Sequence, residues 1–154
     1  GKIVPVEIKG RKGSTIVDKD ETRQVVARDT STYDRDGMQQ RRQLITYGRS
    51  RTGELLSETR TRFDTSDEID HKEIGDYSRP DAQTMVQSWT QTDGDDEVLG
   101  YREVLYKKTK EGRVKSIETT YYGPDGLATS TYYEEFAYDG DGRVVARRAH
   151  TDKY

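Results

Sequence analysis

Two stretches, YGRSRTGELLSETRTRF at residues 47–63 and YKKTKEGRVKSIETTYY at residues 106–122, contain the strongest structural signal in this sequence. Both begin with a tyrosine and place a glycine six residues later. Both then continue through an aliphatic residue and a Ser-x-x-x-Thr pattern to an aromatic residue. The aromatic spacing continues at intervals of 16 residues through Tyr106, Tyr122, Tyr138 and Tyr154. Self-similarity at a fixed period is typical of proteins built from repeated units.

Each unit has the features of one β-strand and one tight turn. The turns read DRDG at 34–37, GPDG at 123–126 and DGDG at 139–142. Glycine permits positive φ there, and aspartate or proline favours the bend. The segments between the turns are rich in Thr, Tyr, Val and Arg and lack helical apolar spacing. The pattern predicts antiparallel strands over roughly 22–33, 37–47, 53–63, 83–92, 100–110, 112–122, 126–138 and 142–150.

We therefore predict an all-β fold, an antiparallel meander of about eight to ten long strands in an open or half-curled sheet. Neither face of the predicted strands is cleanly apolar. That pattern is expected of a sheet with solvent on both sides, which cross-strand pairs hold together. The alternative is an up-and-down β-barrel with a polar interior.

The length fits one domain, which we expect to span residues 1–154. An acidic segment at about 64–81, DTSDEIDHKEIGDYSRPD, interrupts the aromatic spacing and contains a glycine and a proline. We interpret it as an insertion in that domain, either a long surface loop or a short helical turn.

The composition indicates a folded chain with a thin core. Only 30% of the residues are hydrophobic and 36% are charged, but 11 tyrosines argue against disorder. The net charge of −3 argues against a nucleic-acid partner, and no apolar run is long enough for a transmembrane segment. The charge is uneven: seven arginines occur between Arg35 and Arg62, and acids dominate 64–97. Self-association or an ionic partner would explain this asymmetry.

The sequence YDGDGR at 138–143 resembles the Y-D-x-x-G-R signature of the YD repeats of bacterial Rhs proteins. YDRDG at 33–37 and YGPDG at 122–126 are looser matches, and the units here are shorter than those of that family. The resemblance implies an extracellular or cell-surface protein with a shell-forming or binding role. If the chain is secreted, we expect any leader to have been removed before Gly1.

No metal, cofactor or catalytic residue is expected from the motifs. Three Asp-rich segments, 34–37, 139–142 and 93–97, are similar to fragments of calcium loops. A calcium loop of the EF-hand type needs a glutamate at its twelfth position, which is Ile45 or His150 here. The acidic insertion surrounds His71 with carboxylates, but their spacing matches no known ligand set. No nucleophile elbow and no phosphate-binding glycine loop occurs.

Aromatic side chains are the candidate binding residues. On a sheet they can form a platform that stacks against sugars or bases, although aromatics on sheets more often pair across strands. The candidates are Trp89, Tyr101, Tyr106, Tyr121, Tyr132 and Tyr133.

Three functions are consistent with these observations. The first is a non-catalytic interaction or structural module of the secreted or cell-envelope fraction, with a protein or carbohydrate partner. The second is a carbohydrate-binding or small-molecule-binding barrel or half-barrel. The third, a hydrolase with paired carboxylates, is permitted only because acidic residues are abundant.

Overall fold

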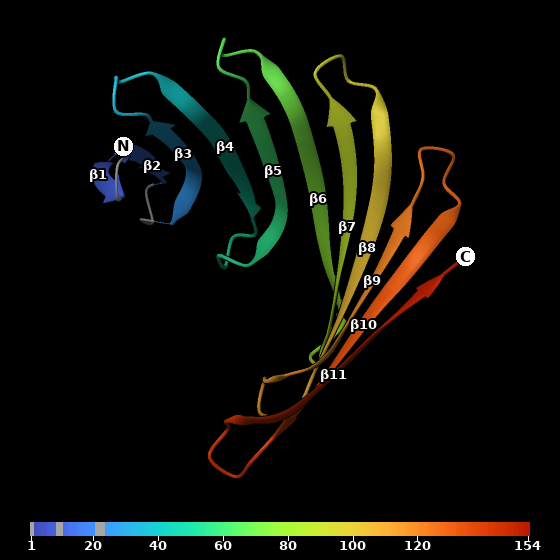
Figure 1. Cartoon of the computed structure of the whole chain (residues 1–154). Coiled ribbons are helices and arrows are strands. Elements are labelled where there is room, and N and C mark those ends of the chain that lie inside the picture. The colour runs from blue at the N-terminus through green and yellow to red at the C-terminus, as the bar shows by residue number, and fades with distance from the viewer. Residues whose placement is uncertain (1, 9–10, 21–23) are drawn as a thin grey trace. The chain divides into compact units, whose positions relative to one another are not determined.

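The computed structural model describes residues 2–8, 11–20 and 24–154, and almost all of these residues form β-strands or tight turns (Figure 1). The strands in the described part of the chain are β1 (Lys2–Ile8), β2 (Arg11–Lys19), β3 (Val25–Tyr33), β4 (Gln39–Arg49), β5 (Leu55–Phe63), β6 (Ile69–Asp81), β7 (Thr84–Asp93), β8 (Val98–Lys108), β9 (Val114–Tyr122), β10 (Ala128–Tyr138) and β11 (Val144–Lys153).

The strands form an antiparallel meander. Their order in the sheet is the same as their order in the chain, and β1 and β11 stand at its two ends (Figure 1). The registers of β1 to β5 and of β8 to β11 are antiparallel throughout. In the described residues β11 pairs with β10 and not with β1, so the sheet is not closed into a barrel. The prediction of an all-β open meander is confirmed.

The chain forms two compact units. Unit 1 comprises residues 1–75 and 91–97, and unit 2 comprises residues 76–90 and 98–154. The ends of β6 and β7 therefore belong to different units. The expectation of a single domain stays a prediction.

One type of turn closes seven of the hairpins in the described residues. The N–H of its first residue donates to the carbonyl of the fifth, and the N–H of the fourth donates to the carbonyl of the first. The fourth residue has positive φ, which glycine adopts most readily. The first residues of these turns are Asp34, Ser50, Asp64, Asp93, Thr109, Gly123 and Asp139.

The prediction of a loop or helical turn at 64–81 is wrong. This segment contains a turn of the same type, which begins at Asp64, followed by the 13-residue strand β6. Asp67 occupies the position of the glycine, with a φ of 64°, so the turn has no glycine to identify it. Gly75 and Pro80 lie within β6, where the sequence suggested irregular structure.

All eight predicted strands exist, with corrections at their ends. Residues 37, 53, 112, 126 and 142, predicted as strand starts, are the positive-φ glycines of the turns. The predicted strand 22–33 begins at Val25 as described, and residues 22–23 lie outside the described part of the chain. Three strands, β1, β2 and β6, were not predicted from the sequence.

The interior is small, as the composition suggests. Among the described residues the buried hydrophobic side chains are Trp89 and Val104, which are 2% and 6% exposed. Threonines and serines occupy most other buried positions, and hydroxyl pairs link neighbouring strands at Thr15–Thr30 and Thr120–Thr131, both 3.3 Å apart. Cross-strand pairs thus provide much of the stabilisation. None of the described residues belongs to a helix of the length and apolar character that a membrane crossing requires.

Candidate functional site

The strand register divides the predicted aromatic residues between the two faces of the sheet. Residues that are directly opposite in an antiparallel pair share a face. Tyr106 is opposite Ile117, Tyr121 is opposite Arg102, and Tyr132 is opposite Thr119, which places these three tyrosines on one face of unit 2. Tyr101 and Tyr133 lie on the other face. The structure therefore does not bring the six candidates together as one platform.

Trp89 on β7 is packed within the sheet. Its ring meets that of Tyr77 edge-on, with centroids 5.9 Å apart, and the guanidinium of Arg102 lies 4.8 Å from its centroid. The indole N–H donates to Oε1 of Gln87 at 3.1 Å. With its ring and its N–H both engaged, Trp89 stabilises the sheet and offers little surface to a ligand.

The tyrosines of β10 also contact neighbouring side chains. The hydroxyl of Tyr132 accepts a hydrogen bond from Nη2 of Arg147 at 2.9 Å, and Arg147 also donates from Nε to Glu134 at 2.8 Å. The hydrogen bond to Glu134 is the main reason that the pKa of Arg147 is raised above its ordinary value. The ring of Tyr133 lies 5.3 Å from that of His150. Tyr121, at 44% exposed, is the most accessible of the candidates.

The aspartates that are similar to calcium ligands cap turns instead. Oδ1 of Asp34 accepts hydrogen bonds from the backbone N–H groups of residues 36 and 38, at 2.9 Å each. Asp64, Asp93 and Asp139 repeat this arrangement at their own turns. Carboxylates held by the backbone in this way explain the Asp-rich turns without a metal.

The histidine of the acidic segment belongs to a small polar cluster on β6 and β7. Nε2 of His71 lies 3.4 Å from Oε1 of Glu73, which also accepts a hydrogen bond from Gln91 at 2.8 Å. Among the described residues, no three His, Asp or Glu side chains are arranged to hold a metal ion.

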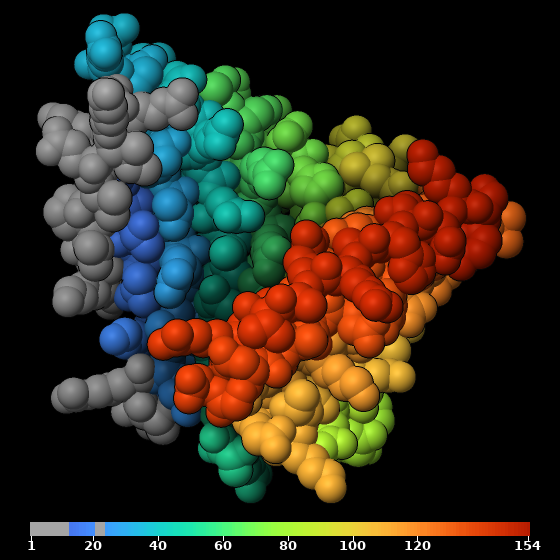
Figure 2. Space-filling model, turned by 60° about the horizontal axis from the view of Figure 1, so that its bottom comes forward, coloured from blue at the N-terminus to red at the C-terminus, as the bar shows by residue number. Residues whose placement is uncertain are grey.

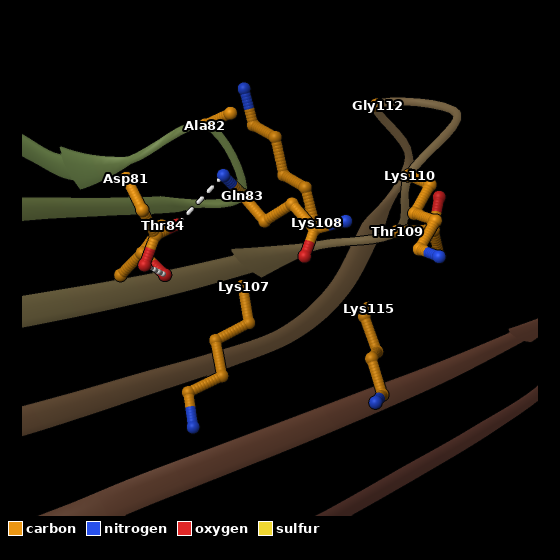
Figure 3. Close-up of a pocket in the computed structure, with 10 residues that line it drawn as sticks. All are labelled: Asp81, Ala82, Gln83, Thr84, Lys107, Lys108, Thr109, Lys110, Gly112 and Lys115. Carbon is orange, nitrogen blue, oxygen red and sulfur yellow. Dashed lines mark hydrogen bonds between the residues drawn. The ribbon is translucent and has the colours of Figure 1, made fainter.

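The most distinctive polar site is a pocket at the end of unit 2, which we call the lysine pocket (Figure 3). The two-residue turn between β6 and β7 forms one side of it, and the turn between β8 and β9 forms the other. A backbone hydrogen bond of 2.7 Å from Lys108 N–H to the carbonyl of Gln83 joins the two sides. The pocket has a volume of about 500 Å³ and is lined by Asp81, Ala82, Gln83, Thr84, Lys107, Lys108, Thr109, Lys110, Gly112 and Lys115.

The positive charge of the lysine pocket is not neutralised within the described structure. Lys107, Lys110 and Lys115 are exposed, Lys108 is half-buried, and none of the four forms an ion pair with a described residue. Figure 3 shows Lys107 on β8 and Lys115 on β9, both close to the β8–β9 turn. The lysine pocket therefore presents a concentrated positive charge in a chain whose net charge is negative.

The one carboxylate in the lining of the lysine pocket, Asp81, is used by the β6–β7 turn. Its Oδ1 accepts the N–H of Gln83 at 2.8 Å, and its Oδ2 accepts the hydroxyl of Thr84 at 3.2 Å. A neighbouring hollow shares three of the lysines and is lined also by Arg113, Glu111 and Asp139. The guanidinium of Arg113 lies 5.9 Å from the centroid of the Tyr138 ring.

Sequence reasoning missed the lysine pocket. The sequence YKKTKEGRVK does place several basic residues around one turn, and that was the available signal. The sequence does not indicate the position of the β6–β7 turn, because that turn directly follows the segment at about 64–81 that was interpreted as an insertion and not as a strand.

Two comparisons with known proteins identify no relative of this chain. The chain matches no protein-family model, and no curated protein has significant sequence similarity to it.

Proposed function

We propose that this chain is a non-catalytic interaction module that binds an acidic segment of a partner protein through the lysine pocket. The observation that carries the proposal is a set of four lysines around one hollow, none of which pairs with an acidic side chain in the described part of the chain. Three of them are exposed on long, flexible side chains, so bringing a carboxylate to them desolvates neither group fully.

Lysine suits this kind of recognition. Its ammonium group is a mobile point charge that accepts carboxylates in many orientations, whereas arginine favours a planar, two-pronged geometry. Complementary charge accelerates the encounter between proteins and selects against partners of the same sign. An acidic peptide segment is thus a better match to the lysine pocket than a rigid small molecule.

The proposal includes a cell-surface or secreted setting and a repeat architecture, both based on the resemblance to YD repeats. In the segment YDGDGR, Tyr138 donates its hydroxyl to the carbonyl of Val114, and Asp139 caps the turn. Gly142 supplies the positive φ of 82°, and the N–H of Arg143 donates to Asp139. Tyr138 thus links the hairpin to β9, while Asp139, Gly142 and the backbone of Arg143 form its turn. These roles support a shell-forming or binding scaffold of stacked hairpins.

The test is to measure the binding of a short oligo-glutamate peptide by isothermal titration calorimetry. We expect wild-type protein to bind it, with an affinity that falls as salt is added. The variant with Lys107→Gln and Lys110→Gln should bind about tenfold more weakly or worse, since each lost charged contact contributes about 1 kcal/mol.

A variant with Lys19→Gln and Lys153→Gln is the matched control, because it makes the same change in net charge at exposed positions outside the lysine pocket. An equal loss of affinity in both variants would mean that only net charge matters. That result, or no binding by the wild-type protein, would overturn the proposal.

A further inference from the structure

We infer that unit 1 carries a separate binding groove for an acidic oligosaccharide. The groove has a volume of about 820 Å³ and runs over β3, β4 and β5. That volume lies within the range of about 300–1,000 Å³ that is usual for ligand sites. The inference uses residues of unit 1 alone and does not depend on the lysine pocket.

The strand register places three arginines on the face that lines this groove. Arg41 is opposite Thr32, and Arg62 is opposite Gln43, so Arg41 and Arg62 are diagonal neighbours about 7–8 Å apart at their Cβ atoms. Arg28 is opposite Ile45, further along the same face. All three arginines line the groove, are exposed, and form no ion pair with a described residue.

These arginines differ from their neighbours on β4 and β5 in having no ion-pair partner among the described residues. Arg42 also lines the groove but pairs with Asp29 and Asp67, and Arg60 pairs with Glu58. The guanidinium groups of Arg28, Arg41 and Arg62 can each donate two parallel hydrogen bonds to a carboxylate.

The rest of the lining is suited to sugar rings. Thr30 and Gln43, which are opposite each other, offer a hydroxyl and an amide, and Ile45 offers an apolar contact. The hydroxyl of Thr32 is buried without a hydrogen-bond partner, which is a rare and costly arrangement in a folded protein. A rotation of the Thr32 side chain toward the groove would let a hydroxyl of a bound sugar satisfy it.

Two carboxylates in the lining of the groove favour an acidic sugar over a nucleic acid as the ligand. Asp64 and Asp70 line the groove together with the arginines. Carboxylates accept hydrogen bonds from sugar hydroxyls, whereas a DNA backbone has no hydroxyl group to donate to them. The mixed lining therefore favours a ligand with both carboxylates and free hydroxyls, such as an oligomer of uronic acids.

The experiment is calorimetric titration of the whole chain with an oligogalacturonate. A neutral malto-oligosaccharide of equal length and a single-stranded oligodeoxynucleotide serve as comparisons. We expect the oligogalacturonate to bind and the neutral sugar to bind at least about tenfold more weakly. The variant with Arg41→Gln and Arg62→Gln should lose about tenfold or more in affinity. Tighter binding of the oligodeoxynucleotide, or equal binding of the neutral sugar, would overturn the inference.

The matched control carries Arg35→Gln and Arg51→Gln, two exposed arginines in turns outside the groove. It should change the affinity by less than about twofold, and a loss as large as that of the groove variant would contradict the inference. Lys107→Gln with Lys110→Gln should also leave oligogalacturonate binding intact. These variants therefore distinguish a failure of the proposal for the lysine pocket from a failure of the inference for the groove.

Thr32→Val gives an independent readout. It removes the unpaired hydroxyl and keeps the shape of the side chain, so the urea midpoint should stay the same or rise. Affinity for the oligogalacturonate should fall. A lower midpoint with unchanged affinity would assign that hydroxyl a purely structural role and contradict its part in the site.

Discussion

Arg42 on β4 holds Asp29 on β3 by two parallel hydrogen bonds. Nε donates to Oδ1 at 3.2 Å and Nη2 donates to Oδ2 at 3.0 Å. The third nitrogen, Nη1, donates to Asp67 in the β5–β6 turn at 3.1 Å, and the guanidinium lies 4.4 Å from the centroid of Phe63. The hydrogen bonds to Asp29 and Asp67 raise the pKa of Arg42 above its ordinary value, with that to Asp29 the larger cause. One side chain thus links two strands and a turn.

Replacing Arg42 by lysine should lower the free energy of unfolding by about 1–2 kcal/mol, because lysine cannot form the two-pronged contact with Asp29 or stack on Phe63. Urea denaturation followed by circular dichroism measures this loss. Arg35→Lys, at an exposed turn position, should change stability by less than about 0.5 kcal/mol. Similar values for the two variants would show that the contacts of Arg42 contribute nothing.

Asp67 should make the stability of unit 1 depend on pH. Hydrogen bonds from Gln39 and then from Arg42 lower the pKa of its carboxyl group below the ordinary aspartate value. A group with a lowered pKa in the folded state stabilises the fold above its unfolded pKa, and this contribution is lost as the pH falls through the folded pKa.

Wild-type protein should therefore be more stable than Asp67→Asn at about pH 7, and this difference should vanish at about pH 2. Urea midpoints at the two pH values give the comparison. Asp36→Asn, in a turn and without a side-chain hydrogen bond between described residues, should show no such pH-dependent difference. A difference for Asp67→Asn that is unchanged at about pH 2 would rule out a charge effect.

Asp96→Gly should stabilise the protein. Asp96 has a φ of 62° at the turn position that glycine occupies elsewhere, and this conformation costs a residue with a Cβ up to about 1–2 kcal/mol. We expect a gain of about 0.5–1 kcal/mol in thermal or chemical denaturation. The reciprocal change Gly126→Ala should lower stability by a similar amount. No atom lies within 4 Å of a Cβ added at Gly126, so the φ of 83° is the only source of strain. A loss of stability in Asp96→Gly would refute this account.

Trp89 and Tyr133 should differ in their contribution to stability. Trp89→Ala removes a ring that is 2% exposed and should cost about 3–5 kcal/mol. Tyr133 is half-buried beside His150, so Tyr133→Ala should cost about 1–2 kcal/mol. A denaturant series on both variants checks the order. Equal losses in the free energy of unfolding would contradict this prediction, because they would mean that the buried Trp89 stabilises the sheet no more than the half-buried Tyr133 does.

The residue at the fourth position of each turn explains which hairpins could be predicted from the sequence. Where glycine stands at the fourth turn position, as at Gly53 and Gly112, the hairpin is recognisable from the sequence. Where aspartate replaces it, at Asp67, the backbone adopts the same conformation but the signal is lost. Gly75 and Pro80 then obscured β6, because both residues are usually poor strand formers.

The candidate sites depend on register, which the aromatic spacing alone does not fix. Tyr101 and Tyr106 are five residues apart on β8, and an odd separation in a strand puts them on opposite faces. The arginines of the groove and the lysine pocket likewise combine residues from separate strands or turns. A pattern along one strand does not indicate which residue of the next strand will be opposite.

Because the strands follow one another in chain order, their position in the sheet also affects how readily each strand opens locally. No described strand bonds to a distant part of the chain, so each hairpin closes only a short loop, at low entropic cost. The side chains of β11 are exposed along its whole length, and this strand lies on the visible surface in Figure 2, in red. Hydrogen exchange should therefore be fastest in β11 and slower in β8 and β9, because an end strand can detach while the inner hydrogen bonds stay intact.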